Sequence, residues 1–353
     1  MLSPVGTKMN ANLQRILFVE LLGGIGDLII ALPALQALKR SHPQATLTVL
    51  TLAPGGELLL TDPFCDRILY ATNGQARSTI ETLLSQAQFD LIISDTNYEG
   101  IDQIIRSSDA AQTLTNLWQK PPADQRVGDR FLDILLHEKL IDSEAILPPV
   151  LCLTDAEKQE AQLIFSQAPS PRIFLYTDAG MPIKRWSTDK LVQLGKALQQ
   201  QFGAGIVLPI GHNYDEVLEI ARQIGGDVQI FSRRSLRQLA AAFTQADLVI
   251  APDTGPARIA AALGVPTITL FGPTWQGRYG QPAPHFNLQG YPACLERNIA
   301  NFTVQSCWYS GVCPLADWQT CVDDISVDQV MTATSSIFKR SIGEHQHGGK
   351  WGN

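Results

Sequence analysis

Short apolar runs rich in β-branched residues alternate with amphipathic stretches, and this alternation constrains the fold more than any other feature of the sequence. It is typical of parallel β-sheets, because neighbouring parallel strands need a long crossover connection, usually a helix. The pattern occurs twice, so we expect two α/β units. The expected strands are Ile16–Val19, Ala45–Leu50 and Phe89–Ser94, with a helix over Leu28–Arg40, and then Ile173–Tyr176, Gly205–Pro209, Leu248–Ala251 and Thr267–Phe271.

The length of 353 residues also favours two domains over one core. We expect an N-terminal domain at 1–150, a linker and hinge region at 151–171, a C-terminal domain at 172–325, and a final helix with a polar tail at 326–353. The linker contains a capping box, Thr154-x-x-Glu157, which predicts the start of a helix that ends before Pro169.

Composition excludes several classes of protein. Hydrophobic residues make up 45% of the chain and charged residues 17%, which indicates a globular protein. The formal charge of −7 gives no general attraction for nucleic acid or an anionic membrane. No uncharged apolar run reaches the roughly 18 residues of a membrane span, and six scattered cysteines without an export signal indicate reduced thiols. We therefore expect a cytoplasmic protein.

A glycine-rich loop over 22–28 joins the first strand to the first helix. Gly24 and Gly26 allow a tight turn, and Asp27 stands at the start of the helix. The loop lacks the third glycine of a dinucleotide fingerprint, where Ile29 stands, and the Gly-Lys-Ser/Thr of a P-loop. Two interpretations remain: Asp27 caps the helix, or it serves as a general base.

The stretch after the strand Leu248–Ala251 can hold a diphosphate. Thr254 and Gly255 open a helix whose backbone N–H groups favour an anion, and Arg258 follows one turn later. The alternative is a capped helix with a surface arginine. Two further segments follow strands: the basic Lys184-Arg-Trp186, which suits a leaving diphosphate or a solvated loop, and Gly211-His-Asn-Tyr-Asp-Glu216. In the second, Asp215 or Glu216 can accept hydrogen bonds from a ribose, or simply begin a helix.

Together these segments resemble the ADP-heptose:lipopolysaccharide heptosyltransferases of glycosyltransferase family 9, over roughly residues 15 to 335. Four pieces match in order and spacing: Gly24-Ile-Gly-Asp-Leu-Ile-Ile-Ala-Leu-Pro-Ala-Leu35, Lys184-Arg-Trp186, Ala246-Asp-Leu-Val-Ile-Ala-Pro-Asp-Thr-Gly255 and Ala262-Leu-Gly-Val-Pro-Thr-Ile-Thr-Leu-Phe-Gly-Pro-Thr274. The resemblance implies a GT-B architecture of two Rossmann-like domains facing a central cleft. The acceptor would bind the N-terminal domain and the nucleotide sugar the C-terminal one.

The resemblance also implies roles for single residues. Asp27 is similar to the catalytic base, Lys184 to a lysine near the donor phosphates, and Asp215 to an acid that contacts the ribose, with Glu216 adjacent. The donor-binding Asp-x-Gly signature corresponds to Asp253, Thr254 and Gly255. Two departures stand out: Arg258 replaces a usual histidine, and the loop 177–181 lacks paired hydroxyl residues.

The expected activity is an inverting, metal-independent transfer of heptose or a related sugar from a nucleotide-diphosphate donor, ADP-linked by resemblance. The acceptor would be lipopolysaccharide or another glycan, and a lipid-linked acceptor would allow peripheral contact with the inner membrane. We expect no cofactor, no nucleic-acid partner and no metal, although Cys294, Cys307, Cys313 and Cys321 leave a metal site open. The alternatives are a nucleotide-sugar hydrolase or epimerase and a non-catalytic nucleotide-sugar-binding protein.

Overall fold

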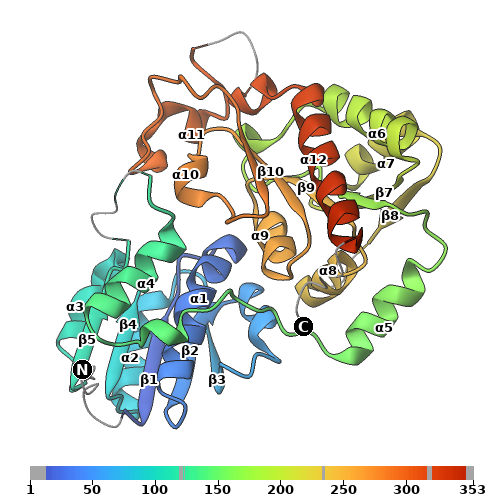
Figure 1. Cartoon of the computed structure of the whole chain (residues 1–353). Helices are drawn as coiled ribbons and strands as arrows, with labels where there is room; N and C mark the ends of the chain where they lie inside the picture. The colour runs from blue at the N-terminus through green and yellow to red at the C-terminus, as the bar shows by residue number, and fades with distance from the viewer. Residues whose placement is uncertain (1–12, 119–121, 123, 233–234, 316–319, 347–353) are drawn as a thin grey trace, which may run out of the picture. The chain divides into compact units, whose positions relative to one another are not determined.

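The computed structural model describes residues 13–118, 122, 124–232, 235–315 and 320–346 (Figure 1). The chain forms two compact units. The first is built from residues up to Cys152, and the second from Leu153 onward together with the short segment 122–124. Each unit contains one parallel sheet, as the repeated pattern of strands and helices predicts.

The sheet of the first unit has five parallel strands in the order β3-β2-β1-β4-β5. Its strands are β1 (Arg15–Val19), β2 (Thr46–Leu52), β3 (Arg67–Ala71), β4 (Leu91–Ser94) and β5 (Gln112–Thr115). The three inner strands are mostly buried, and Leu, Ile, Val and Phe make up most of their residues alongside the threonines of β2, as expected where helices cover both faces of a sheet. In the register of the central strand, Val19 pairs with Leu50 on one side and Ser94 on the other.

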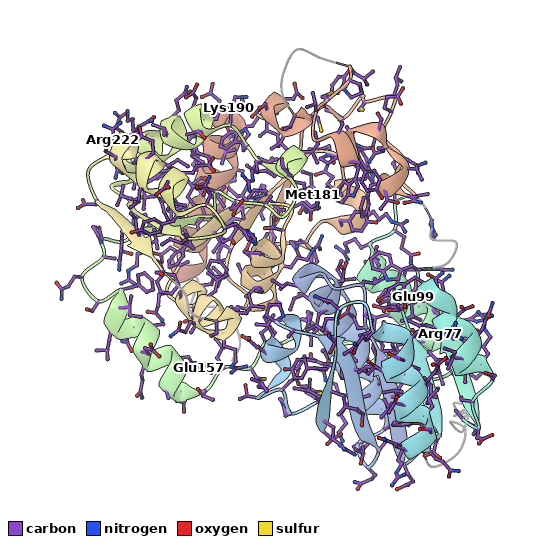
Figure 2. The ribbon with its side chains drawn as sticks, turned by 180° about the vertical axis from the view of Figure 1, so that it is seen from behind. Arg77, Glu99, Glu157, Met181, Lys190 and Arg222 are labelled. Atoms are coloured by element: carbon purple, nitrogen blue, oxygen red, sulfur yellow. The ribbon has the colours of Figure 1, made fainter. Side chains whose placement is uncertain are left out.

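Helices cover both faces of this sheet (Figure 1). The elements are α1 (Ile25–Ser41), α2 (Ala76–Gln86), α3 (Ile101–Arg106) and α4 (Val127–His137), with 3-10 turns η1 (Gly55–Leu59), η2 (Tyr98–Gly100) and η3 (Ser143–Ala145). Apolar residues of α2 and α3 share a core with β1, β2 and β4, whereas α1 packs against α4. Figure 2 shows Arg77 of α2 beside Glu99, whose backbone carbonyl accepts a hydrogen bond from Arg77 Nη1 at 2.8 Å.

The second unit contains six parallel strands in the order β11-β10-β9-β6-β7-β8. They are β6 (Arg172–Leu175), β7 (Gly205–Pro209), β8 (Val228–Phe231), β9 (Leu248–Pro252), β10 (Thr267–Phe271) and β11 (Phe286–Gln289). The chain runs outward from β6 to one edge of the sheet and then returns to β9 on its other side. The carboxyl ends of β7, β6 and β9 therefore lie side by side, which is where ligands bind in open α/β sheets.

Two helical layers enclose this second sheet. Its helices are α5 (Asp155–Ile164), α6 (Thr188–Phe202), α7 (Tyr214–Ile224), α8 (Leu236–Phe243), α9 (Gly255–Ala262), α10 (Gln276–Tyr279), α11 (Ser306–Ser310) and α12 (Val327–Gln346), with 3-10 turns η4 (Pro182–Lys184), η5 (Phe302–Val304) and η6 (Cys321–Asp324). α6, α7 and α12 share one core with the sheet. On the other face α8 contacts α5 and α9, and Phe174 of β6 packs edge-on against Phe165 and Phe243.

The predicted elements are present, with shifted ends. Gly205–Pro209 and Thr267–Phe271 match β7 and β10 residue for residue. The capping box is confirmed, because Thr154 Oγ1 accepts from the backbone N–H of Glu157 at 3.2 Å, and Glu157 accepts from the N–H of Thr154 at 2.7 Å. The helix expected from Leu28 was placed too late, since α1 begins at Ile25. Gly26 and Asp27 therefore belong to its first turn.

We predicted a linker at 151–171 and a separate final segment at 326–353, and these domain boundaries remain predictions. Within those ranges, α5 packs against α8 and α12 packs against α6. The part of the predicted polar tail at 347–353 lies outside the described residues. Among the helices described, none combines the length and the apolar character that crossing a bilayer requires.

Candidate functional site

The loop between β1 and α1 places Asp27 at the carboxyl edge of the first sheet. Gly23 adopts a left-handed backbone with φ +89°, and Gly24 occupies the N-cap position of α1. A Cβ atom on Gly24 would lie 2.3 Å from Asp27 Oδ2, so a side chain there would displace the carboxylate. Asp27 is half-buried and does not occupy the capping position itself. Gly26 lies in the first turn beside it.

Two further acids, Glu20 and Asp95, lie at the same sheet edge, and both are 1% exposed. Burial raises the pKa of Glu20 to about 7, and the nearby Asp27 carboxylate adds to this effect. Burial, together with the charges of Glu20 and Asp27, raises the pKa of Asp95 well above its usual value. The sequence analysis missed both acids, although each directly follows a buried strand and that position is a usable signal.

In the second unit, Asp253 binds two of the predicted cations. This carboxyl lies at the end of β9 and is 4% exposed. Its Oδ2 is 2.9 Å from Lys184 Nζ and accepts from Thr274 Oγ1 at 2.7 Å, and its Oδ1 accepts from Arg258 at 2.8 Å. Lys184 also donates to the Asp253 backbone carbonyl at 3.1 Å. Both oxygens of the predicted donor-binding acid are therefore occupied by protein groups.

The electrostatics of this group favour an anionic ligand. Burial would raise the pKa of Asp253, but the charges of Lys184 and Arg258 and the Thr274 hydroxyl together hold it below its usual value. Two cations then accompany one anion, so the group has a net positive charge. Lys184 keeps 16% of its side chain exposed, whereas Arg258 is 7% exposed and is not the surface arginine of the alternative interpretation.

Thr254 and Gly255 lie beside this group at the start of α9. Thr254 is the N-cap residue, but its hydroxyl donates to the Pro252 carbonyl at 3.1 Å and makes no cap bond. Gly255 is the first residue of the helix. The first backbone N–H groups of a helix have no partner within the helix, so they suit phosphate oxygens.

A second polar group follows β6 and β7. Asp178, which is 4% exposed, accepts hydrogen bonds from the backbone N–H groups of His212 at 2.6 Å and Ala179 at 2.8 Å, and pairs with Arg185 at 2.6 Å. Burial alone would raise the pKa of Asp178, but these hydrogen bonds and the charge of Arg185 together lower it. A Cβ atom on Gly211 would lie 2.5 Å from Asp178 Oδ2, which explains the glycine at this position.

The two acids predicted to contact a ribose have different surroundings. Glu216 accepts from Thr188 Oγ1 at 3.3 Å and from Asn213 Nδ2 at 3.0 Å, and lies 3.8 Å from Arg185. Asp215 is exposed in the first turn of α7. The side chain of Glu216 is therefore committed to its neighbours, while that of Asp215 faces solvent.

The structure thus separates the predicted residues into three groups. Lys184, Asp253, Thr254, Gly255 and Arg258 lie together at β9 and α9; Gly211, Asp215 and Glu216 lie at β7 and α7; Gly24, Gly26 and Asp27 belong to the first unit. Sequence reasoning missed Thr274, Asp178 and Trp308, whose ring lies 5.3 Å from Lys184 Nζ. Trp186, from the basic segment, is a core residue that donates to the Ile325 carbonyl at 3.1 Å.

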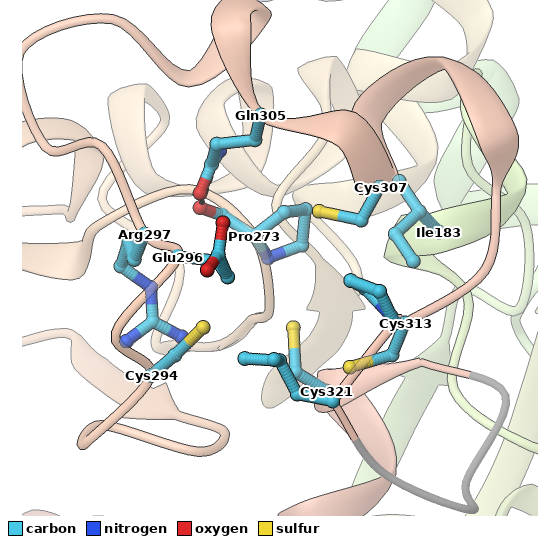
Figure 3. Close-up of a pocket in the computed structure, with 11 residues that line it drawn as sticks. Ile183, Pro273, Cys294, Glu296, Arg297, Gln305, Cys307, Cys313 and Cys321 are labelled. Atoms are coloured by element: carbon cyan, nitrogen blue, oxygen red, sulfur yellow. Dashed lines mark hydrogen bonds between the residues drawn. The ribbon is translucent and has the colours of Figure 1, made fainter.

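Four cysteines, Cys294, Cys307, Cys313 and Cys321, line one small cavity of about 20 Å³ (Figure 3). All six cysteines of the chain are free thiols. Burial raises the pKa of Cys321 to about 12, and also raises the pKa of Cys307. Within the described ranges, no group of three or more His, Cys, Asp or Glu side chains is arranged to hold a metal ion. The expectation of no metal stays a prediction.

Comparison with known families decides the assignment. The family model described as glycosyltransferase family 9 (heptosyltransferase) matches residues 82–292, more than half of the chain. The chain belongs to glycosyltransferase family 9. Lipopolysaccharide heptosyltransferase 3 of Escherichia coli K12 is 24% identical over 277 residues, which cover 70% of this chain and 80% of that protein. The family resemblance that the motifs predicted is therefore confirmed, and this family 9 protein is a glycosyltransferase enzyme.

Solved structures agree on the fold. The glycosyltransferase family 9 structure from Veillonella parvula has a TM-score of 0.77 at 18% identity, covering 93% of this chain and 98% of its own. The ADP-heptose lipopolysaccharide heptosyltransferase II of E. coli has a TM-score of 0.68 at 16% identity, covering 93% and 99%. The predicted α/β architecture with two parallel sheets is confirmed, and it is the fold that these two proteins share with this chain. The roles of single site residues stay predictions.

Proposed function

We propose that this family 9 enzyme transfers heptose or a related sugar from an ADP-linked donor to a lipopolysaccharide-type acceptor. The transfer inverts the anomeric centre and needs no metal. The donor and acceptor classes are those that the names of similar proteins carry: ADP-heptose and lipopolysaccharide. Metal independence is supported by the sequence, which contains no Asp-x-Asp motif of the kind that holds a metal in other glycosyltransferases.

The observation that supports the donor site best is the group of Lys184, Arg258 and Asp253. It presents a net positive charge at the carboxyl end of β9, next to the start of α9. A diphosphate needs several positively polarised donors, and charge-assisted hydrogen bonds from Lys and Arg are among the strongest available. Thr254 and Gly255 bring backbone N–H groups to the same place.

In the proposed reaction, the acceptor hydroxyl loses its proton to the Asp27 carboxylate as its oxygen attacks the anomeric carbon. The bond from that carbon to the diphosphate breaks, and its electron pair leaves with the nucleoside diphosphate. Lys184, Arg258 and the N-terminus of α9 stabilise the negative charge that develops on this leaving group. Inversion follows because a single displacement attacks from the face opposite the leaving group.

Calorimetric titration with ADP, UDP and GDP tests the donor site, first with a chelator present and then with magnesium. We expect selective binding of ADP that does not need magnesium. Lys184→Ala should weaken ADP binding by about tenfold or more, because a hydrogen bond to a charged group contributes about 1.5–3 kcal/mol. Lys196, an exposed lysine on α6 of the same unit, provides the matched control as Lys196→Ala.

A transfer assay with ADP-heptose and lipopolysaccharide acceptor completes the test. Sugar should reach the acceptor, with ADP release depending on the acceptor. ADP release or sugar isomerisation at the same rate without acceptor would indicate a hydrolase or an epimerase instead. Binding of ADP by folded protein without turnover under any condition would indicate a non-catalytic nucleotide-sugar-binding protein.

A further inference from the structure

Three polar side chains lie in a row at the carboxyl edge of the first sheet. Val19 of β1 pairs with Leu50 of β2 and with Ser94 of β4. The next residue on each strand continues this register, so Glu20 lies between Thr51 and Asp95. Backbone bonds from Glu20 N to the Leu50 carbonyl, 2.9 Å, and from Asp95 N to the Val19 carbonyl, 3.2 Å, support it. Adjacent strands are about 4.8 Å apart, so the two carboxyl groups are direct neighbours.

The two carboxyl groups of this row have unequal hydrogen bonding. Glu20 Oε2 accepts from Thr51 Oγ1 at 2.8 Å, and Glu20 Oε1 accepts from the backbone N–H of Leu22 at 3.2 Å. Asp95 Oδ1 accepts from Thr96 Oγ1 at 2.8 Å. No described residue donates to Asp95 Oδ2 with the distance and angle of a normal hydrogen bond. The Trp118 indole acts on Asp95 only as a weak donor, which lowers the pKa of this carboxyl, and burial outweighs it.

An unpaired oxygen on a buried carboxylate is costly, whereas a protonated carboxyl can use that oxygen as a donor. The poorly bonded Asp95 Oδ2 thus fits a proton held next to Glu20. Beyond the pair itself, the ionisable side chains with printed effects are Asp27 from the first turn of α1, which acts on both acids, and Tyr98 of η2, on which both acids act. Neither is a cation, and no Lys or Arg stands among the main influences on the pKa of Glu20 or Asp95. Two buried carboxylates that close together would retain one proton.

We propose that Glu20 and Asp95 form a proton-sharing pair that sets the strength of Asp27 as the base. This inference rests on the proposed role of Asp27 in transfer. With one proton on the pair, one negative charge stays near Asp27 and makes its carboxylate a better proton acceptor. With two protons on the pair, that charge is lost. The pair keeps its own protons during the reaction, so the acceptor proton still ends on Asp27. Glu20 and Asp95 are thus positioning residues that touch no substrate.

The dependence of kcat/KM on pH tests the inference, measured for the wild type, Glu20→Gln and Thr51→Val. The wild-type curve should contain a rise near pH 7, where Glu20 titrates. The curve of Glu20→Gln should lack this rise. Above pH 8 its kcat/KM should be about three- to tenfold below that of the wild type, with an unchanged KM for the donor. Thr51→Val removes a hydrogen bond that favours the charged form, so it should move the rise to higher pH and keep the upper plateau.

Curves of the wild type and Glu20→Gln that coincide over the whole pH range would overturn the inference. If Glu20→Gln does not fold, an unshifted rise in Thr51→Val would overturn it as well. Carboxyl ¹³C NMR of the wild type without substrate gives an independent readout, because a carboxyl that titrates near pH 7 should be missing from Glu20→Gln. If the wild type shows no carboxyl that titrates near pH 7, the proton-sharing pair is contradicted, whatever the transfer activity. If that carboxyl is present but the protein has no transfer activity, only the proposed function is rejected.

Discussion

Replacing Glu20 by glutamine should flatten the dependence of the unfolding free energy on pH. The pKa of Glu20 is raised from 4.5 to about 7 in the folded protein, about 2.5 units. At about 1.36 kcal/mol per unit, the difference amounts to about 3 kcal/mol. Because the folded state binds this proton more tightly than the unfolded chain, the stabilisation is complete below pH 4.5 and is lost as pH rises through 7.

Glutamine imitates the protonated acid and does not titrate. Its carbonyl oxygen can accept from the Leu22 N–H, and its amide N–H can donate to the Thr51 hydroxyl, which can turn to accept it. Glu20→Gln should therefore lie within about 1 kcal/mol of the wild type near pH 5 and exceed its stability by about 3 kcal/mol near pH 8. Asp95, whose pKa is also raised, keeps some dependence on pH in both proteins.

Urea unfolding followed by circular dichroism between pH 5 and pH 8 measures this effect, with the slope m compared between proteins to check for a common transition. Glu144→Gln is the matched control, because Glu144 is exposed in η3 of the same unit. It should leave the wild-type curve unchanged. Equal dependence on pH in the wild type and Glu20→Gln would refute the reasoning from burial.

Two further predictions concern the proposed site. Asp27→Asn should lower the rate of transfer at least about a hundredfold while ADP affinity stays within about twofold, whereas the exposed Asp109→Asn should keep full activity; comparable turnover in Asp27→Asn would reject the base. Asp253→Asn should destabilise the protein by about 3–5 kcal/mol at pH 7 in urea unfolding, because Lys184 and Arg258 lose a buried partner. Because the pKa of Asp253 is lowered in the folded protein, its contribution to the unfolding free energy is present at neutral pH and is lost only as pH falls below about 3.8. A stability difference between the wild type and Asp253→Asn that appears only above neutral pH would contradict the ion pairs as its cause.

The sequence predicted the inner strands of both sheets and missed the outer ones. The four strands that the sequence analysis did not predict are β3, β5, β8 and β11, and these are the edges of the two sheets. Inner parallel strands are buried on both faces and give continuous apolar runs, so β7 and β10 could be predicted to the residue. Edge strands are mostly half-buried, and their composition is too mixed to stand out.

Motifs pointed to the candidate site residues, but not to the contacts between them. Lys184 and Asp253 are 69 positions apart, and nothing in the local sequence shows that they form an ion pair. Glu20 and Asp95 each look like an ordinary strand end. Only the pairing of β1 with β4 makes them neighbours, and strand order is a property of the whole sheet. Local pattern therefore identifies candidates, while charge pairing needs the fold.

The saturated carboxylate of Asp253 also bears on how this site can change in evolution. Both of its oxygens interact with protein groups, namely Lys184, Thr274 and Arg258. Loss of Lys184 or Arg258 would therefore leave a buried charge without one of its partners. These residues should be inherited together. The motif resemblance implies a histidine in related proteins where this chain has Arg258, and a histidine N–H could also donate to the acid. If the proposed donor site is right, such an exchange would preserve the hydrogen bond while altering the charge offered to the diphosphate, so related enzymes could diverge in donor preference without losing the fold.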